Sequence, residues 1–446
     1  MKILCVSLGC DKNLVDTEMM LGLLNRDGHT FTDDENEADI IVINTCCFIN
    51  DAKEESVNTI LEMAELKKTG KCKALIVTGC MAQRYKQEIL EEIPEVDGIL
   101  GTSTYDEISN VLKQALGGEA DVSCFHDLNA LPEVETSRII TTGGHYAFLK
   151  IAEGCDKHCT YCIIPSLRGN YRSVPMERLL KEANELADQG VRELILVAQE
   201  TTLYGVDLYG KKMLPELLHK LAEIPGIYWI RIQYCYPEEI TDEFIEAIRT
   251  EEKVCHYLDV PIQHASDRIL KRMGRRTNQA QLREIIGKLR AAVPDIALRT
   301  TMISGFPGET QEDHEEVMRF VDEMEFERLG VFTYSAEEDT PAAAFPDQIP
   351  EEVKEERRDE IMELQQEIAF EKSESMVGRV LDVMIEGKVA DEAAYVGRTY
   401  MDAPNVDGYI FVNSGELFMS GDFVRVKVTG SNDYDLIGEV YDESAE

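Results

Sequence analysis

The most informative segment of the chain is Gly154-Cys155-Asp156-Lys157-His158-Cys159-Thr160-Tyr161-Cys162. Its three cysteines are separated by three and then two residues, so one loop can turn three thiolates toward a common point. A structural zinc site normally closes with four ligands, and a ferredoxin cluster also takes four thiolates. Three ligands leave one metal position open for a substrate or a cofactor, which indicates a chemically active site.

The composition indicates a globular protein with more than one domain. The chain has 446 residues, 44% of them hydrophobic and 29% charged, which is enough for two or three hydrophobic cores. Its twelve cysteines are far fewer than a secreted disulfide scaffold of this length would carry, which favours a reducing compartment, and we expect the cytoplasm. No apolar run approaches the roughly 18 residues of a membrane span, so we expect no membrane association. Residues 3–10 faintly resemble a lipoprotein cleavage site, but their apolar part is shorter than a signal-peptide core of about 7 to 15 residues, and we interpret them as a strand.

The charge limits the partners. The formal net charge is −40 and the isoelectric point is near 4.5. A phosphate backbone is repelled by such a surface unless a local basic patch attracts it, so direct binding of nucleic acid is disfavoured. The alternative is an acidic surface that only keeps the protein soluble.

The first 140 residues alternate short apolar runs with amphipathic segments. Residues 2–8, 39–43 and 74–78 are nearly continuous and rich in β-branched side chains, as expected of strands buried on both faces of a parallel sheet. Residues 16–26 and 53–67 have helical periodicity. The pattern predicts a doubly wound α/β domain over 1–140.

Each of these three strands ends in a cysteine: Cys10, Cys46 and Cys80. Parallel strands have their carboxyl ends at one edge of the sheet, where open α/β sheets bind ligands. A lone cysteine there is more often a small buried hydrophobe, but three at equivalent positions favour a second three-cysteine metal site. Cys47 adjoins Cys46 and leaves a one-residue ambiguity.

A turn-rich linker, 117–144, leads into a second alternating region, 141–374. It contains six predicted strands, with helical patterns at 177–189, 278–292 and 310–324 and a charged helical connector at 351–374. The predicted strands are 146–151, 193–198, 228–234, 257–262, 297–303 and 328–334. Six β/α units predict a partial TIM-like barrel, with the cysteine loop after its first strand at the catalytic face.

The last segment, 375–446, changes to short alternating strands broken by Gly, Asn and Asp. It fits a five-stranded OB-like β-barrel. The strands are predicted at 379–389, 395–400, 409–413, 423–429 and 436–440. Its 5 Lys or Arg stand against 14 Asp or Glu, so this barrel would repel RNA and suit a basic polypeptide.

The residues resemble those of a known family. Cys155-x3-Cys159-x2-Cys162, with Tyr161 before the last cysteine, looks like the signature of radical S-adenosylmethionine enzymes. An amino-terminal domain with three cysteines, a radical barrel and a terminal TRAM domain together resemble the methylthiotransferases of that class, over essentially all 446 residues.

This resemblance implies two 4Fe-4S clusters and S-adenosylmethionine as cofactors. It assigns Cys46, and not Cys47, to the second cluster. It also suggests Tyr161 and Gln263 as cofactor contacts. The implied metal ligands are Cys155, Cys159 and Cys162 in the barrel, and Cys10, Cys46 and Cys80 in the amino-terminal domain.

The family acts either on an aspartate of ribosomal protein S-twelve or on an adenosine of tRNA. Residues 7–16 (SLGCDKNLVD), 262–268 (IQHASDR) and 330–335 (GVFTYS) resemble the ribosomal-protein branch, and the acidic barrel favours it too. Two departures from the branch, Asp11 in place of proline and Val174 in place of arginine, touch no implied ligand.

In that branch a radical made at the barrel cluster would abstract hydrogen from the β-carbon of the aspartate. A methylthio group from the second cluster would then join the carbon. The resemblance therefore implies a reductase or other electron donor and a sulfur donor as partners, beside ribosomal protein S-twelve, free or on the small subunit. The alternatives are methylthiolation of tRNA and a non-catalytic iron-sulfur or zinc protein.

Overall fold

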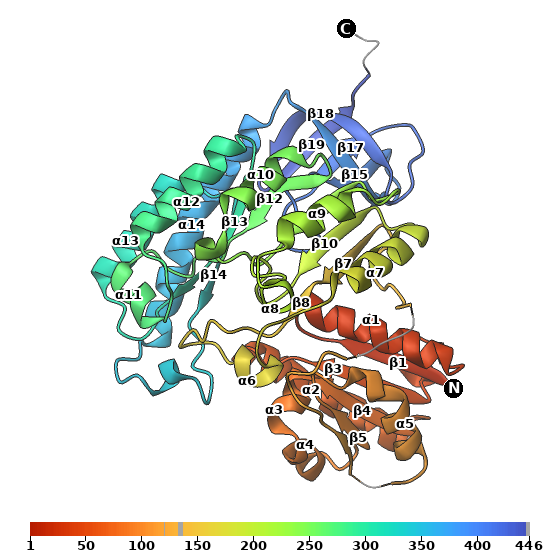
Figure 1. The fold of residues 1–446 in the computed structure, drawn as a ribbon. Coiled ribbons are helices and arrows are strands. Elements are labelled where there is room, and N and C mark those ends of the chain that lie inside the picture. The colour runs from red at the N-terminus through yellow and green to blue at the C-terminus, as the bar shows by residue number, and fades with distance from the viewer. Residues whose placement is uncertain (120, 133–136, 443–446) are drawn as a thin grey trace.

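The computed structural model describes residues 1–119, 121–132 and 137–442, and these form three units, each built on its own sheet (Figure 1). Parts of the predicted linker, residues 120 and 133–136, and the end of the predicted last domain, 443–446, lie outside the described residues. In the described ranges, no helix is both long and apolar enough to cross a membrane.

The amino-terminal unit is a six-stranded parallel sheet in the order β2-β1-β3-β4-β5-β6. Its strands are β1 (Lys2–Ser7), β2 (Thr30–Phe31), β3 (Ile40–Thr45), β4 (Ala74–Gly79), β5 (Gly98–Leu100) and β6 (Val122–Cys124). Its helices are α1 (Asp11–Arg26), α2 (Asn50–Thr69), α3 (Cys80–Tyr85), α4 (Gln87–Glu92) and α5 (Ile108–Leu116), with 3-10 turns η1 (Glu35–Glu37) and η2 (Tyr105–Glu107).

Helices cover both faces of this sheet, which confirms the predicted doubly wound domain. Along β3, Ile41 and Ile43 pack with α2, whereas Ile40 and Val42 pack with α1 and α5. This alternation is why the strand is apolar at every position. The strand order changes direction between β1 and β3, and α/β folds bind ligands beyond the carboxyl ends of the strands at such a switch point.

The middle unit is a parallel sheet in the order β7-β10-β11-β12-β13-β14, which is also the order along the chain. Its strands are β7 (Tyr146–Lys150), β10 (Glu193–Val197), β11 (Trp229–Ile232), β12 (Val254–Asp259), β13 (Ala297–Ser304) and β14 (Arg328–Thr333). A short hairpin, β8 (Ala152–Glu153) with β9 (Arg172–Ser173), flanks the cysteine loop. The edge strands are β7 and β14, so the predicted partial (β/α)6 barrel is confirmed as open.

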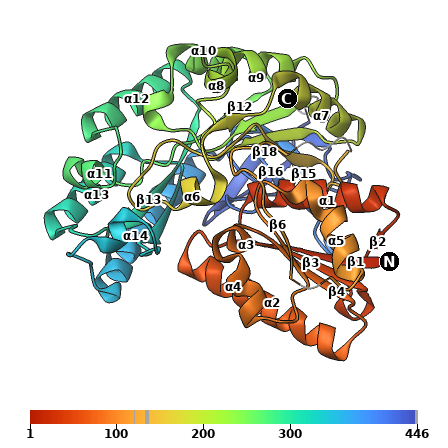
Figure 2. The same cartoon turned by 60° about the horizontal axis from the view of Figure 1, so that its bottom comes forward.

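Helices form an arc around the outside of this open barrel (Figure 2). They are α7 (Met176–Asp188), α8 (Val206–Tyr209), α9 (Leu214–Ala222), α10 (Asp242–Thr250), α11 (Asp267–Arg272), α12 (Gln279–Ala292) and α13 (Gln311–Met324), with 3-10 turns η3 (Pro237–Glu239) and η4 (Pro341–Ala344). The short helix α6 (Ile164–Arg168) lies away from this arc and packs against α3 of the amino-terminal unit. Capping boxes at Asn278 and Thr310 fix the starts of α12 and α13. The predicted charged connector is α14 (Glu351–Ser375), which packs on β14 and α13 and buries Ile361 and Ile368.

The carboxy-terminal unit is a closed barrel of five strands, which confirms the barrel predicted from the sequence. The strand order is β15-β16-β17-β19-β18. Its strands are β15 (Val380–Lys388), β16 (Ala394–Arg398), β17 (Ile410–Asn413), β18 (Phe423–Asn432) and β19 (Asp435–Val440). It shares a core with residues at the amino ends of the middle strands, among them Trp229 and Ala297.

Buried charges fix this contact. Glu193, the first residue of β10, accepts hydrogen bonds from Arg398 of β16 at 2.6 Å and from Arg231 of β11 at 2.7 Å, and all three side chains are fully buried. The small barrel therefore sits at the end of the open barrel opposite to the cysteine loop, which follows the carboxyl end of β7.

Candidate functional site

The loop with Cys155, Cys159 and Cys162 begins directly after β8 and is held by backbone contacts. The Cys155 N–H donates to the Gly169 carbonyl at 3.1 Å, and the Thr160 N–H donates to the Met273 carbonyl at 2.9 Å. Gly154 has a φ of +77°, and a Cβ there would lie 2.1 Å from the Asn170 carbonyl oxygen. Only glycine fits this turn, so Gly154 is needed to present the first cysteine.

All three cysteines of this loop are free thiols. Burial raises the pKa of Cys155 to about 11 and that of Cys162 to about 12. A thiol in such surroundings stays protonated on its own, whereas a coordinated cation makes it a thiolate. Three free thiols on one loop, those of Cys155 and Cys159 buried and that of Cys162 partly exposed, are therefore a donor set that fits an iron-sulfur cluster better than a nucleophile acting alone.

The side chains beside this loop include an aromatic ring, that of Tyr236, and a cation, that of Arg275. The Tyr236 hydroxyl lies 3.9 Å from the Cys159 sulfur, and the Arg275 guanidinium lies 4.4 Å from the centroid of the Tyr236 ring. The Nε of Arg275 is buried and has no hydrogen-bond partner. Unpaired buried donors are rare in folded proteins, so this one is available to an acceptor brought in by a ligand.

Glu200, just beyond β10, offers an acceptor on the same face. Burial raises the pKa of its carboxyl group to about 7. One oxygen accepts a hydrogen bond from the Thr202 N–H at 2.9 Å, and the other is buried without a partner. The burial of Glu200 is visible only in the structure.

The two predicted cofactor contacts lie on the same side of the barrel. Tyr161 is half-buried and packs edge-on against Phe306, with ring centroids 6.4 Å apart. Gln263 follows β12, and its backbone bonds to Thr301 and Ile303, both at 2.8 Å. Gln263 has a φ of +71°. Non-glycine residues held at positive φ are strained and concentrate at functional sites, but contact with a cofactor stays a prediction for both side chains.

The second trio lies at the switch point of the amino-terminal sheet. Cys10 follows β1 and caps α1, Cys46 follows β3, and Cys80 follows β4 as the first residue of α3. Burial, and then the thiols of Cys80 and Cys10, raise the pKa of Cys46 to about 12, which places the three sulfurs within electrostatic range of one another. The fold thus brings together cysteines that are 36 and 34 residues apart in sequence.

The neighbourhood of Gly9 favours Cys46 over Cys47. A Cβ on Gly9 would lie 2.8 Å from the Cys46 sulfur, so the loop before Cys10 packs directly on Cys46. Cys47 is fully buried in the apolar cluster beneath α2 and α3. Adjacent residues of an extended chain point to opposite sides, which explains the difference.

Neither trio is gathered around a single ion. Among the described residues, no three His, Cys, Asp or Glu side chains converge on one metal position. The ligands of a multi-iron cluster are separated by the width of the cluster, so the relevant observation is the donor set, three free cysteines at each place.

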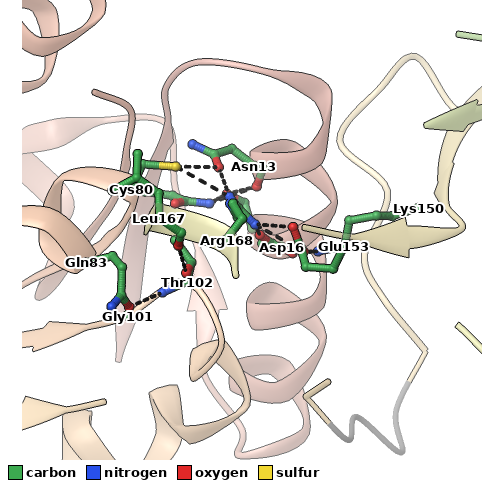
Figure 3. A network of polar contacts seen from close by, with 12 residues as sticks. Asn13, Asp16, Cys80, Gln83, Gly101, Thr102, Lys150, Glu153, Leu167 and Arg168 are labelled. Carbon is green, nitrogen blue, oxygen red and sulfur yellow. Dashed lines mark hydrogen bonds and ion pairs between the residues drawn. The ribbon is translucent and has the colours of Figure 1, made fainter. Parts of the chain in front are cut away.

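A buried polar network runs from Cys80 of the second trio to Glu153, two residues before Cys155, and the sequence did not predict it (Figure 3). Its centre is Arg168, the last residue of α6, which is 2% exposed. Its guanidinium donates to Asp16 at 2.8 Å and to Glu153 at 3.2 Å, and lies 3.7 Å from the Cys80 sulfur. Lys150 pairs with the same two carboxylates.

Asn13 extends the network into the second trio. Its side-chain oxygen accepts a hydrogen bond from Arg168, and its amide nitrogen donates to the carbonyls of Leu8 and Thr45, both at 3.0 Å. These carbonyls lie in the segments that carry Cys10 and Cys46. Asn13 therefore links Arg168 to both of these segments.

Lys12 also lies between the trios. Its side chain is 4% exposed, and its ammonium lies 3.3 Å from the centroid of the Tyr234 ring. Burial acts to lower the pKa of Lys12, but Tyr234, Cys10 and Asp11 outweigh it, and the pKa is raised, so the ammonium stays charged.

Comparisons with known proteins agree with this architecture. Residues 2–101 match the Uncharacterized protein family UPF0004, residues 149–321 match the Radical SAM superfamily, and residues 377–440 match the TRAM domain. The matched ranges fall within the three predicted domains, whose boundaries stay predictions.

Similar curated proteins cover nearly the whole chain. A protein of Lachnoclostridium phytofermentans named "Ribosomal protein uS12 methylthiotransferase RimO" is 68% identical over 98% of this chain and 99% of its own length. Proteins of the same name from Acetivibrio thermocellus and Clostridioides difficile are 52% and 48% identical, each over 100% of this chain and over 99% and 100% of their own lengths.

Among solved structures, the radical S-adenosylmethionine methyltransferase TsrM from Kitasatospora setae, with cobalamin and a [4Fe-4S] cluster bound, matches with a TM-score of 0.54. It is 12% identical, and the match covers 74% of this chain and 72% of that protein. This likeness concerns the fold alone.

Proposed function

This chain belongs to the ribosomal protein uS12 methylthiotransferase RimO family of radical S-adenosylmethionine enzymes, and from that membership we propose that it adds a methylthio group to the β-carbon of an aspartate in uS12. It is a transferase. We place its activity in the cytoplasm, because the substrate is a ribosomal protein. The reaction also takes an electron donor and a sulfur donor.

The observation that carries the proposal is the Arg168 junction. One guanidinium contacts Cys80 of the second trio and Glu153, which lies two residues before Cys155 of the first. A protein that used its two trios independently would not need to bury charged groups between them, since burying charge is costly unless every group is paired. This junction supports a single reaction that uses both trios.

The residues present fit two 4Fe-4S clusters. Each trio consists of free cysteines, and each has a buried cation beside it: Arg275 at the barrel trio and Arg168 at the second. Cations near the sulfurs stabilise thiolates and the negative charge of a cluster. We assign Cys155, Cys159 and Cys162 to one cluster, and Cys10, Cys46 and Cys80 to the other.

When bound, the clusters and S-adenosylmethionine would supply the radical and the sulfur of the reaction. The chain's own residues do the positioning. Gly154 and the backbone bonds of Cys155 and Thr160 hold the barrel loop in place. Arg168 donates toward Cys80 and keeps the amino-terminal domain against the barrel mouth, which helps to exclude water from the space between the trios.

The test is anaerobic reconstitution followed by mass spectrometry of two substrates. We expect about eight irons per chain and a methylthio adduct on uS12 but not on tRNA. Cys80→Ala should lose the second cluster and the adduct. Cys72→Ala is the matched control, because Cys72 is another buried cysteine of the same domain; it precedes β4, whereas Cys80 follows it, and its sulfur donates to the Ala74 carbonyl at 3.3 Å.

Three results would count against the proposal. An adduct on tRNA alone would show that the substrate is tRNA and not uS12. A protein that binds zinc and no iron would rule out the radical reaction. A Cys80→Ala protein that inserted sulfur at the normal rate with its barrel cluster intact would show that the second site is wrong.

A further inference from the structure

Residues 335–342, which follow β14, form a bridging segment between the two units that carry the trios. On the barrel side, the Ala342 N–H donates to the Thr160 carbonyl at 2.9 Å. Thr160 directly follows Cys159 of the barrel trio. Ala342 is fully buried in an apolar cluster against which Tyr161 packs. The bridging segment is therefore part of the packing that holds the barrel loop in place.

On the amino-terminal side, the bridging segment contributes the carboxylate of Glu337, which is 2% exposed. One oxygen accepts a hydrogen bond from Arg84 of α3 at 3.1 Å and lies 3.6 Å from the ammonium of Lys53 of α2. The other oxygen accepts from the Ser335 hydroxyl at 2.8 Å. Arg84 lies four residues after Cys80 in α3, so both side chains are on the same face of that helix.

The ion pairs of Glu337 depend on the docking of the two units. Glu337 belongs to the middle unit, whereas Arg84 and Lys53 belong to the amino-terminal unit. A buried carboxylate is costly unless a cation pairs with it, so separation of the units would leave Glu337 without these partners. These contacts therefore favour one docked arrangement over others in which the units touch but Glu337 is unpaired.

Two side chains of the middle unit hold α3. Arg168 lies 3.7 Å from the Cys80 sulfur at the start of the helix, and Glu337 pairs with Arg84 one turn later. A single contact leaves a helix free to turn about that contact, whereas two contacts along the helix fix its direction. Because the bridging segment is also bonded to Thr160, the direction of α3 is fixed relative to the barrel loop.

We propose that Glu337 is a positioning residue, which orients the second trio relative to the barrel trio and so couples the consumption of S-adenosylmethionine to sulfur insertion. The proposal rests on the proposed function. Glu337 acts through Arg84 and α3, and not as a cluster ligand. Without its carboxylate both clusters should still form. The substrate carbon and the sulfur would be held less well together, so S-adenosylmethionine would be consumed without product.

The experiment compares two neighbouring carboxylates of the bridging segment. Glu337→Gln keeps the shape of the side chain and removes its charge. Glu338→Gln is the matched control, because the Glu338 carboxylate lies 3.7 Å from the same Arg84 but is 71% exposed, and exposed ion pairs contribute little. After anaerobic reconstitution we measure iron content, S-adenosylmethionine consumed and methylthio groups added to uS12. Hydrogen exchange of α3 in the cluster-free full chain gives a readout apart from activity.

We expect Glu337→Gln to keep the iron of both trios. The S-adenosylmethionine consumed per methylthio group should rise by about 10- to 100-fold, because a misplacement of about 1 Å can cost a reaction about 100-fold. Exchange in α3 should become about 10-fold faster or more, the usual worth of a hydrogen bond between charged groups. Glu338→Gln should change neither quantity. Arg84→Met removes the same ion pair from the other side and should also raise the ratio.

Three results would overturn the inference. The first is an unchanged ratio in Glu337→Gln, or in Arg84→Met if Glu337→Gln does not fold by thermal unfolding. The second is an equal rise in Glu338→Gln. The third is loss of iron from either trio in Glu337→Gln, which would make Glu337 a support for cluster binding. Failure of the proposed function looks different, because the unchanged enzyme would then add no methylthio group to uS12, while exchange in α3 would still respond to Glu337→Gln.

Discussion

Replacing Arg168 by methionine tests the junction between the trios most directly. The side chain is 2% exposed, and methionine fills much of its volume while removing the charge and the donors. Asp16 and Glu153, which are 3% and 4% exposed, would then keep Lys150 as their shared ion-pair partner among the described residues. Breaking a buried ion pair by removing one partner costs about 3–5 kcal/mol, because the remaining charge stays buried and uncompensated.

A loss of this size is large against the roughly 5–15 kcal/mol that stabilises a folded protein. We expect the loss at the contact between α1 and α6, so the amino-terminal domain should separate from the barrel before either domain unfolds. Hydrogen exchange on the cluster-free full chain should show faster exchange in α1 and α6, and urea unfolding should show an earlier first transition.

Arg283→Met is the control for this experiment. Arg283 forms an ion pair with Glu323 at 2.7 Å, but the two side chains are 38% and 47% exposed, and exposed pairs contribute about 0–1 kcal/mol. If Arg168→Met costs no more than Arg283→Met, or if exchange rises equally over the whole chain, the junction does not hold the domains together and our reasoning is refuted.

The remaining predictions concern the barrel loop, the small barrel and acid stability. Gly154→Ala should lower the iron content of the barrel cluster while leaving that of the second, because a Cβ would collide with the Asn170 carbonyl; equal iron at both sites would contradict it. Arg398→Met should loosen the carboxy-terminal barrel, since Glu193 would lose one of its two cations, at a cost of about 3–5 kcal/mol. Protease cleavage near residues 376–379 measures that loosening, and unchanged cleavage argues against it. Burial acts to raise the pKa of Asp313, but hydrogen bonds from Ser266, Thr310 and Arg268 outweigh it and hold the pKa at about 2, below the usual 3.8. Ionised Asp313 therefore stabilises the fold above pH 3.8, and this contribution is lost as the pH falls toward 2. Asp313→Asn should be destabilising at pH 7, with a difference that shrinks over that window in unfolding curves; a difference independent of pH would exclude this role.

The amino-acid sequence is sufficient to predict the three units, which the structure confirms, and to suggest the two cysteine trios as metal sites. Buried strands such as β3 consist of nearly continuous apolar runs rich in β-branched residues. A cysteine follows each of three such runs: Cys10, Cys46 and Cys80. These signals are local, because strand burial and strand ends are expressed within a few residues. The position of the second trio at one edge of the sheet could be inferred for the same reason, since parallel strands have their carboxyl ends at one edge.

The contacts between the three units are visible only in the tertiary structure. The charge of the last segment was visible in the sequence, but its place at the end of the barrel opposite to the cysteine loop follows from Glu193 and Arg398, 205 residues apart. Arg168 and Cys80 are 88 residues apart, and no sequence pattern around either residue predicts that the two are in contact. A buried charge must find its partner wherever the fold brings one, so such pairs leave no periodic trace in the sequence.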